Sequence, residues 1–372
     1  MSDGPNLSEL KLPGSRRVVI AMSGGVDSSV AAALLKEAGH EVIGATQKLQ
    51  ECHEAQGSRS CCGVDGIVRA RAVAGQLGIA HYVIDCVREF EREVLRPAWD
   101  EYEHGRTPSP CLLCNERIKF GQLLAWSQRI GASCVATGHY ARIERVADGR
   151  LVLLRGVDPE KDQSYFLAGL TPEQLSALLF PVGHLTKPEV RSIGRTLGLS
   201  TAETHDSQDA CLVGPDQSFA EMLRGRFSAV TTGGVIVDDS GEVIGRHAGV
   251  HHFTVGQRRG LGVSSTTRRW VREIRAENDV VVATDREDAL LSRHLVAKGM
   301  SWLTPPPIDD DTLECEVQIR YRHTPAPATV APRGDGTVAV TFNEPVRAIT
   351  PGQAAVFYDG GRVLGRGWID VR

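Results

Sequence analysis

The chain has 372 residues, 24% of them charged, and a formal net charge of -4 at neutral pH. At roughly 100 to 200 residues per domain, this length predicts two or three domains, each able to bury a core. A slightly acidic chain excludes a general electrostatic attraction to nucleic acid, so any RNA-binding surface has to be a local patch. There is no apolar stretch of signal-peptide length at the N-terminus and no run near the about 18 apolar residues of a membrane helix. We therefore expect a cytoplasmic protein without a membrane partner.

The first half of the chain alternates apolar β-type runs with helical patterns. A strand at 18–22 is followed by a Gly/Ser turn and a helix at 28–38. Further strands are expected at 41–46, 81–85 and 133–138, and further helices at 64–77, 90–102 and 116–129. This alternation predicts an α/β fold with a doubly wound parallel sheet.

The second half becomes β-rich after two helical stretches. Residues 171–180 and 187–198 each place a proline in the first helical turn. From Thr231 onward, short β-type runs alternate with Gly, Pro and Asp, which predicts two smaller β-rich domains. We expect domains at 1–216, 217–296 and 297–372, the last one barrel-like, and a boundary between two β modules at the proline-rich segment 304–311.

The strongest local motif is SGGVDSS at residues 23–29, between the first strand and the first helix. Its glycines let a ligand approach the backbone, its serines offer hydroxyl donors, and the helix N-terminus presents N–H groups, all of which suit a phosphate. Asp27 would repel that phosphate unless Mg²⁺ lay between them, so a nucleotide with Mg²⁺ is expected. No Gly-Lys-Ser/Thr follows, so the motif is not of the Walker type. It resembles the PP-loop of ATP pyrophosphatases, which cleave ATP between the α and β phosphates and adenylate an acceptor.

Several cysteines lie in segments that suit chemistry. Cys111 and Cys114, three residues apart, suit a metal, an exchangeable disulfide or a nucleophile with a neighbouring thiol. Cys211 follows the polar run at 206–210, which is typical of a functional loop. A further group lacks the spacing of a standard zinc site, and we interpret its members as incidental loop residues: Cys52, His53, Cys61 and Cys62.

Eight ordered motifs are similar to those of the bacterial tRNA-specific 2-thiouridylase family, and they span almost the whole chain from residue 18 onward. They are SGGVDSS (23–29), GRTPSPCLLCNERIKF (105–120), ATGHYAR (136–142), KDQSYFL (161–167), FPVGHLTKPEVR (180–191), DSQDACLV (206–213), TVGQRRGLG (254–262) and TPGQAAVFY (350–358).

The resemblance implies a set of site residues. Cys114 matches the family's catalytic nucleophile, and Cys211 matches the cysteine that receives sulfur as a persulfide. The expected nucleotide contacts are Ala21, Met22, Ser23, Gly24, Gly25, Val26, Asp27, Ser28 and Ser29 in the loop, with Gln47 and Gly138 added by the resemblance; the family usually has an apolar residue in place of Gln47. The expected tRNA contacts are Ser109, Pro110, Cys111, His139, Lys161, Asp162, Gln163, Arg320, Tyr321 and Gln353.

The resemblance also implies a reaction. ATP would adenylate the C2 oxygen of the wobble uridine in tRNA, which turns a poor leaving group into a good one. The persulfide on Cys211 would deliver sulfur to C2, and attack by Cys114 would release the product and leave a disulfide for a reductant to open. The sulfur would come from a persulfide donor, such as a cysteine desulfurase or a sulfur-relay protein.

One position departs from the family pattern, because Cys111 stands where the family has Asp. Cys111 is then either a tolerated replacement or one of three ligands of a [4Fe-4S] cluster with an open iron, together with Cys114 and Cys211. The sequence leaves both interpretations open.

Two functions of other classes compete with thiolation. A PP-loop synthetase that adenylates a small molecule would use the loop but leave the cysteines without a role, and so would a nucleotide-dependent RNA-binding protein without chemistry. Positive charge gathers at residues 246–275, where seven arginines accompany one acid, Glu273. We expect Arg258 and Arg259 in this segment to contact RNA phosphates.

Overall fold

The computed structural model describes residues 16–51, 64–204, 218–227, 232–264, 267–305 and 311–371. The chain divides into two compact units. Unit 1 contains residues up to 93, 111–217 and 361–363, and unit 2 contains 94–110, 218–360 and 364–372. Cys211, Cys52, His53, Cys61 and Cys62 lie outside the described residues. Among the described residues, no helix has the length and hydropathy needed to cross a membrane.

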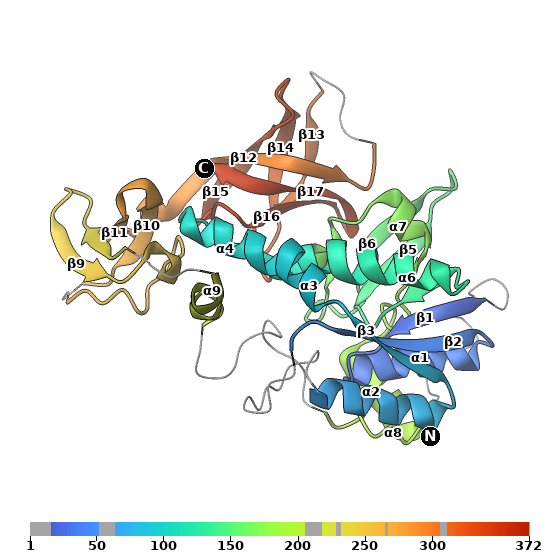
Figure 1. The fold of residues 1–372 in the computed structure, drawn as a ribbon. Coiled ribbons are helices and arrows are strands. Elements are labelled where there is room, and N and C mark those ends of the chain that lie inside the picture. The colour runs from blue at the N-terminus through green and yellow to red at the C-terminus, as the bar shows by residue number, and fades with distance from the viewer. Residues whose placement is uncertain are drawn as a thin grey trace. The chain divides into compact units, whose positions relative to one another are not determined.

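Unit 1 is built on a parallel sheet with the strand order β3-β2-β1-β4-β7. Its strands are β1 (Arg17–Ala21), β2 (Glu41–Lys48), β3 (Ala80–Asp85), β4 (Cys134–Ala136) and β7 (Leu178–Leu179). The apolar run of β1 is buried because the sheet is covered, and its core side chains meet those of α1 (Val26–Glu37), α2 (Val64–Leu77) and α8 (Lys187–Thr196). Figure 1 shows β1, β2 and β3 adjacent, with α1 and α2 beside them.

The strand order creates a switch point at β1. The chain runs from β1 outward through β2 to β3, and then returns to the other side of β1 as β4. In open parallel sheets, ligands bind beyond the carboxyl ends of the strands at such a reversal. The loops after β1 and β4 are therefore the ones that topology selects for a site, and they contain the glycine-rich motif and Gly138.

The predicted α/β fold with a doubly wound parallel sheet is confirmed, and the strands and helices expected up to residue 138 are present, with ends displaced by a few residues. The helical stretch expected at 171–180 is wrong in its second half, because the helix ends at Ser176 and Leu178–Leu179 form the edge strand β7. The helix expected at 90–102 is a continuous helical run of α3 (Val87–Phe90), a π-helical segment (Glu91–Leu95) and α4 (Arg96–Glu103). The helix expected at 116–129 begins earlier, as α5 (Pro110–Leu113), η3 (Cys114–Gln122) and α6 (Leu123–Arg129). Unit 1 also contains α7 (Pro172–Ser176), η4 (Ser164–Leu167) and a hairpin that the sequence analysis missed, β5 (Ala141–Arg145) and β6 (Leu151–Arg155).

Unit 2 contains a four-stranded sheet with the order β10-β11-β8-β9. The strands are β8 (Gly234–Val237), β9 (Val243–His247), β10 (Trp270–Arg275) and β11 (Val280–Thr284), and α9 (Phe219–Phe227) precedes them. Residues 94–110 pack with this unit: Tyr102 lies against Phe219, and a side chain at Gly105 would collide with Ile274. A stretch inside the predicted first domain is thus part of the second compact unit.

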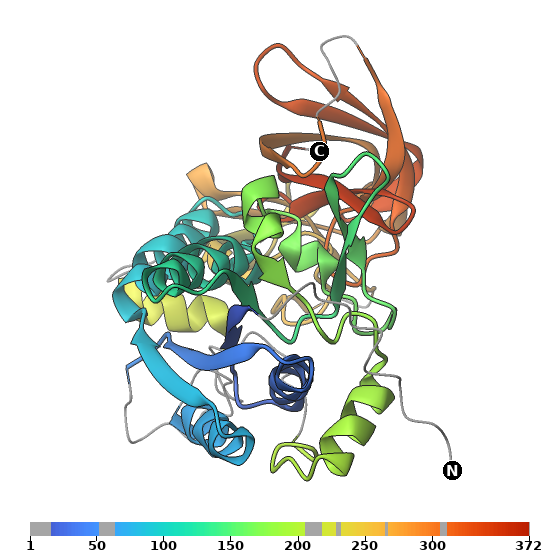
Figure 2. The ribbon, with the colours of Figure 1, turned by 90° about the vertical axis from the view of Figure 1, so that its right-hand side faces the viewer.

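The C-terminal strands of unit 2 form a closed barrel, because β12 pairs with both β15 and β17. Its strands are β12 (Leu291–Trp302), β13 (Leu313–Gln318), β14 (Ala326–Pro332), β15 (Val338–Arg347), β16 (Ala354–Asp359) and β17 (Arg362–Val371), drawn in orange to red in Figure 2. The predicted boundary at 304–311 is wrong, since this segment joins two strands of one barrel. β12 ends at Trp302, shortly before Pro305, so the first proline follows the end of a strand within the barrel and does not mark the end of a module.

Candidate nucleotide and thiol site

The loop after β1 is held by its own serines. The hydroxyls of Ser28 and Ser29 donate to the carbonyl of Gly25, with O–O distances of 3.1 and 2.9 Å, and the Ser23 N–H donates to Ser28 Oγ at 3.2 Å. Gly25 is the N-cap of α1 and supplies no capping side chain, so the first-turn N–H groups are not covered by a cap residue. This backbone arrangement suits an anion at the positive end of the helix dipole.

Two glycines make the loop possible by close backbone approach. A Cβ on Gly138 would lie 2.6 Å from the Ser28 nitrogen and 2.7 Å from the Asp27 carbonyl carbon. A Cβ on Gly24, whose φ is +75°, would lie 2.4 Å from the Gly66 oxygen. Met22 and Val26 direct their side chains into the core, each 2% exposed, so only their main chains and that of Ala21 at the end of β1 are left for a ligand.

Asp27 is the charged centre of the loop, and it has a cation as its partner. Lys187 Nζ lies 2.7 and 2.8 Å from its two carboxylate oxygens, and the Tyr140 hydroxyl donates to Oδ1 at 2.7 Å. Lys187 starts α8 and is 8% exposed, and its own main-chain N–H donates to Asp158. Lys187 therefore offsets the negative charge of Asp27 within the protein. Repulsion between Asp27 and a phosphate is then no longer a reason by itself to expect Mg²⁺ at this residue.

A basic cavity of about 410 Å³ lies next to Lys187. Its cationic lining residues outnumber the acids Asp158 and Glu160; they are Lys161, Lys187, Arg191 and Arg195. Arg191 donates to the carbonyls of Ala202 and Thr204, directly before the segment that contains Cys211. This cavity can accept an anion close to the loop.

The two cysteines of the CLLC motif lie on one helical turn. Cys111 belongs to α5 and is half-buried, whereas Cys114 begins the π-helical η3 and is 7% exposed. Gln47, at the end of β2, donates to the Ile118 carbonyl of η3 at 3.0 Å and to Cys86 Sγ at 3.7 Å. A π-helical stretch is uncommon and often lies at functional sites.

A path of hydrogen bonds inside unit 1 joins η3 to the loop. Asn115, next to Cys114, donates to the Phe166 carbonyl at 3.1 Å, and the Phe166 N–H donates to the Gln163 carbonyl at 3.0 Å. Gln163 and Tyr140 exchange two bonds, of 2.9 and 3.0 Å, and Tyr140 reaches Asp27. The segment that carries Cys114 is thus tied to the residue that organises the nucleotide loop.

His139 lies beside the same segment and is half-buried. Its Nδ1 lies 2.7 Å from the Thr137 hydroxyl, and its ring packs against Phe120 and Phe180 with centroid distances of 5.8 and 6.0 Å. Burial lowers the pKa of His139 well below its usual range, and Lys119 adds to this effect. The imidazole is therefore neutral at physiological pH and can serve as a hydrogen-bonding or stacking group.

The segment 161–163 has internal partners. The carboxylate of Asp162 accepts bonds from Arg155, from the main chain of Gly156 and from both the N–H and the hydroxyl of Ser164. A carboxylate with this many donors organises a turn. Lys161 borders the basic cavity, so it is the member of the segment best placed for an RNA phosphate.

Two predicted tRNA contacts of unit 2 hold its own backbone. Gln353 Nε2 donates to the carbonyls of Thr107 and Pro108, at 3.1 and 2.9 Å, immediately before the buried Ser109 and then Pro110. Arg320 donates to the Arg347 carbonyl at 3.2 Å. Tyr321, next to Arg320, is half-buried, and the guanidinium of Arg322 lies 5.5 Å from the centre of its ring.

The arginine-rich segment is only partly neutralised. Arg272 pairs with Asp239 at 2.5 Å and Arg275 pairs with Glu273 at 2.8 Å, so these two arginines are engaged within the unit. Arg258 and Arg259 are exposed on the turn between Thr254 and Leu261. Arg246 and Arg268 are exposed as well, whereas Arg272 and Arg275 are engaged in ion pairs.

Sequence reasoning missed Lys187 and assigned no role to Tyr140. Both lie in motifs that we noted, FPVGHLTKPEVR and ATGHYAR, but their partner, Asp27, is more than a hundred residues away. A lysine in the first turn of a helix is a usable signal, because a cation is unfavourable at that end of the dipole unless an anion compensates for it.

The fold and the loop define a PP-loop type α/β protein, with a nucleotide-type loop at the switch point of a parallel sheet and β-rich domains after it. Residues 16–215 match the family described as tRNA methyl transferase HUP domain, 225–285 the tRNA methyl transferase PRC-barrel domain, and 292–369 the aminomethyltransferase beta-barrel domain.

Curated relatives match over nearly the whole chain. The protein named "tRNA-specific 2-thiouridylase MnmA" of Geobacter metallireducens is 48% identical over 361 residues, covering 96% of this chain and 97% of the relative. Proteins with the same name in Geotalea uraniireducens and Koribacter versatilis are 47% and 45% identical and cover 95% of this chain, with 95% and 99% of their own lengths. The chain belongs to the tRNA-specific 2-thiouridylase family, and the resemblance predicted from the motifs is confirmed.

Proposed function

We propose that the protein is a tRNA-uridine 2-sulfurtransferase that adenylates the C2 oxygen of the wobble uridine with ATP and then replaces that oxygen with sulfur. Membership of a family whose curated members are named as 2-thiouridylases supports this proposal. The observation that carries it is the hydrogen-bonded path from Asn115, beside Cys114, to Asp27 in the loop. Activation and sulfur chemistry need a common cavity, and this path connects the two segments inside unit 1.

The loop residues are suited to hold the phosphates of ATP. The N-terminus of α1 and the backbone of Gly24 and Gly25 would bind them, and Gly138 leaves the space that a side chain would close. Lys187 keeps Asp27 oriented and adds a cation beside the departing pyrophosphate. Mg²⁺, carried by ATP, would supply further charge neutralisation of the phosphates. Uridine O2 attacks the α phosphorus, and pyrophosphate leaves.

The sulfur step uses two thiols. The terminal sulfur of a persulfide on Cys211 attacks C2, AMP leaves, and a C2–S–S–Cys211 link results. The Cys114 thiolate attacks Cys211 Sγ, which releases the 2-thiouridine thiolate and forms a disulfide between Cys114 and Cys211. A thiol reductant restores both cysteines, and a cysteine desulfurase or a sulfur-relay protein reloads Cys211.

The remaining residues would bind tRNA. We assign the exposed Arg258 and Arg259, together with Lys161 and His139, to phosphate and base contacts. Gln353 and Arg320 would act indirectly, by holding the backbone before Ser109 and the loop of the barrel. We divide the work among a catalytic domain at 1–216, a central domain at 217–296 and a tRNA-binding barrel at 297–372. Because ATP and tRNA are both cytoplasmic, the protein would act in the cytoplasm.

A [4Fe-4S] cluster on Cys111, Cys114 and Cys211 is the second candidate chemistry. Cys111 and Cys114 share one helical turn, which suits two ligands of a cluster. Anaerobic purification followed by iron and acid-labile sulfide assays separates the two mechanisms. About four iron and four sulfide ions per chain would favour the cluster mechanism over the persulfide mechanism. Neither element near that ratio would exclude the cluster and leave Cys111 as a tolerated replacement for Asp.

The test of the function is reconstitution with unmodified tRNA, ATP and a persulfide donor. We expect pyrophosphate release that depends on tRNA, and 2-thiouridine in the digested nucleosides by mass spectrometry. Cys114→Ser should keep pyrophosphate release and lose at least about 100-fold of the 2-thiouridine yield. Pyrophosphate release that ignores tRNA would favour a small-molecule synthetase, and binding of tRNA without either product would favour an RNA-binding protein.

A further inference from the structure

Two consecutive histidines and a glutamate meet in unit 2, whereas the nucleotide loop and Cys111 and Cys114 belong to unit 1. One nitrogen of each histidine and one carboxylate oxygen lie within 4.8 Å of one another, and this is the metal-type cluster found in the part of the chain that the structure describes. We propose that Glu221, His251 and His252 bind a divalent transition-metal ion of the Zn²⁺ type. Glu221 belongs to α9, whereas the histidines belong to the short turn η5 (Val250–His252).

The closest pair already has the spacing that a metal requires. His252 Nε2 and Glu221 Oε1 are 3.2 Å apart. Ligands at about 2.0 to 2.1 Å from a tetrahedral Zn²⁺ are separated by about 3.3 Å. The same distance also fits an ion pair between His252 and Glu221 without a metal. The third residue therefore decides between a metal site and a simple ion pair.

His251 is that third residue, and its environment calls for a partner. It is 4% exposed, and its Nε2 has no hydrogen-bond partner among the described residues. Buried polar groups are almost always satisfied, so a buried orphan nitrogen needs an explanation.

The neighbouring residues hold the ligands in place. Ser218 caps the Glu221 N–H, and Arg224 binds Glu221 Oε2 at 3.0 Å, which leaves Oε1 directed to the histidines. Trp99 packs against the His251 ring at 5.5 Å. A side chain at position 249 would lie 2.4 Å from His251 Cε1, so Gly249 makes room for the ring. Such supporting contacts are typical of metal ligands.

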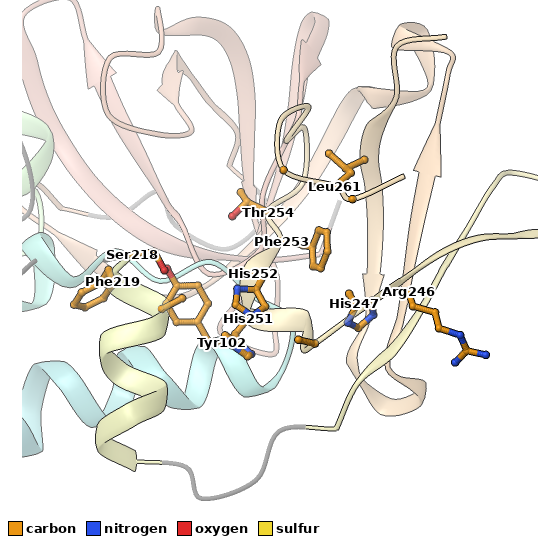
Figure 3. A pocket seen from close by; sticks show the side chains of 14 residues that line it. Tyr102, Ser218, Phe219, Arg246, His247, His251, His252, Phe253, Thr254 and Leu261 are labelled. Carbon is orange, nitrogen blue, oxygen red and sulfur yellow. The ribbon is translucent and has the colours of Figure 1, made fainter. Parts of the chain in front are cut away.

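The two histidines line a cavity of about 450 Å³, shown in Figure 3 with Tyr102 and Phe253 around it. Three protein ligands leave a fourth tetrahedral position for water or for a group that enters this cavity. The ion would join α9 to η5 and so fix one side of the cavity. Two imidazoles and one carboxylate favour Zn²⁺ over Mg²⁺ and Ca²⁺, which prefer oxygen ligands.

The experiment measures Zn²⁺ and Co²⁺ binding to the purified full chain after removal of metals with a chelator. Affinity comes from competition with a chromophoric chelator, and the absorption of bound Co²⁺ identifies its ligands. Thiolate ligands give a sulfur-to-cobalt charge-transfer band, which separates this site from the cysteines. We expect one Co²⁺ per chain without that band, and at least about 100-fold weaker binding of it in His252→Gln and in Glu221→Gln.

Matched controls come from the same unit. His294→Gln in β12 and Glu344→Gln in β15 alter an exposed histidine and an exposed glutamate, and they should leave binding unchanged. Because His252 and Glu221 are about 30% exposed, their variants should fold, which circular dichroism checks. Equal Co²⁺ affinity in wild type and both site variants would overturn the proposal and leave only an ion pair. Bound Co²⁺ that shows thiolate ligation alone would overturn it as well.

Discussion

The nucleotide loop of unit 1 and the predicted tRNA contacts of unit 2 use their polar groups in different ways. Around the loop, side chains hold the backbone and leave the N-terminus of α1 without a capping side chain. In unit 2, Gln353 and Arg320 direct their donors to main-chain carbonyls of their own unit. A polar residue in a family motif can therefore either contact a ligand or stabilise the backbone around the ligand site.

The difference has an energetic origin. A loop that binds an anion needs N–H groups without internal partners, and it obtains rigidity from glycine contacts and from the buried Lys187. A buried carbonyl left without a donor costs free energy, so Gln353 stabilises the segment before Ser109 whether or not RNA is bound. Substitutions in the two regions should consequently separate catalysis from stability.

The largest effect is expected at Lys187. Lys187→Met removes the cation beside Asp27 and leaves that carboxylate facing the phosphates, so tRNA-dependent pyrophosphate release should fall by about 100-fold or more. The measurement is the rate of pyrophosphate release at saturating tRNA and ATP. Arg286→Ala, which removes an exposed ion pair with Asp288, is the control and should change the rate by less than about twofold.

A double substitution tests whether the pair acts as a unit. If Lys187 serves to neutralise Asp27, then Asp27→Asn combined with Lys187→Met should be no worse than Lys187→Met alone. If the rate losses of the two single variants multiply in the double variant, the two residues would instead contact the nucleotide independently.

Gly138→Ala should give the next largest effect. The new Cβ would lie 2.6 Å from a main-chain nitrogen of the loop, so the first turn of α1 must shift. We expect the KM for ATP to rise at least about tenfold and the unfolding free energy to fall by about 1 to 3 kcal/mol. Gly75→Ala is the matched control, because the structure has no atom within 4 Å of its Cβ position in α2. That variant should gain about 0.5 to 1 kcal/mol of stability. An unchanged KM for ATP in Gly138→Ala would show that the loop after β4 does not constrain the nucleotide loop after β1.

The sequence predicted the parallel sheet and the loop well, because both depend on local patterns. The apolar run at 18–22 predicts a strand, and the motif at 23–29 predicts a phosphate-binding loop, without reference to any other part of the chain. It could not predict the partner of Asp27, since that contact joins residues 160 positions apart. Nor could it predict that β12 closes a barrel across the proline-rich segment, because strand pairing depends on register between distant segments.

The same limit explains the tRNA residues. A family motif identifies Asp162 and Gln353 as important, but it does not say whether they touch RNA or hold a turn. Asp162 accepts a hydrogen bond from the Gly156 N–H, and Gln353 donates one to the Thr107 carbonyl. These bonds depend on the local backbone conformation and on long-range packing, so the sequence could not predict them. For Asp27 the sequence predicted a role beside Mg²⁺ but not the ion pair with Lys187 that holds its carboxylate.

Gln353→Ala should lower stability without any tRNA present. Removing one amide leaves two carbonyls without their donor, and the unfolding free energy should fall by about 1 to 2 kcal/mol in urea denaturation. Arg258→Ala is the comparison, since it should leave stability unchanged, weaken tRNA binding and reduce the salt slope of log K by about 1. A Gln353→Ala protein of wild-type stability that binds tRNA poorly would make Gln353 a direct contact.

The smallest effect concerns His323 at the end of the Arg320 loop. Burial lowers the pKa of His323 from 6.5 to about 4, and Arg320 adds to the shift. Between these two pH values the unfolded chain binds a proton that the folded chain does not bind, so stability falls as the pH decreases from 6.5. Allowing for partial exposure, we expect about 1 kcal/mol of loss between pH 7 and pH 5. His323→Gln should lose less stability over this range in parallel urea denaturations. Identical pH dependence in both proteins would mean that the pKa of His323 is the same in the folded and unfolded chains, and that this loop is better hydrated than its contacts indicate.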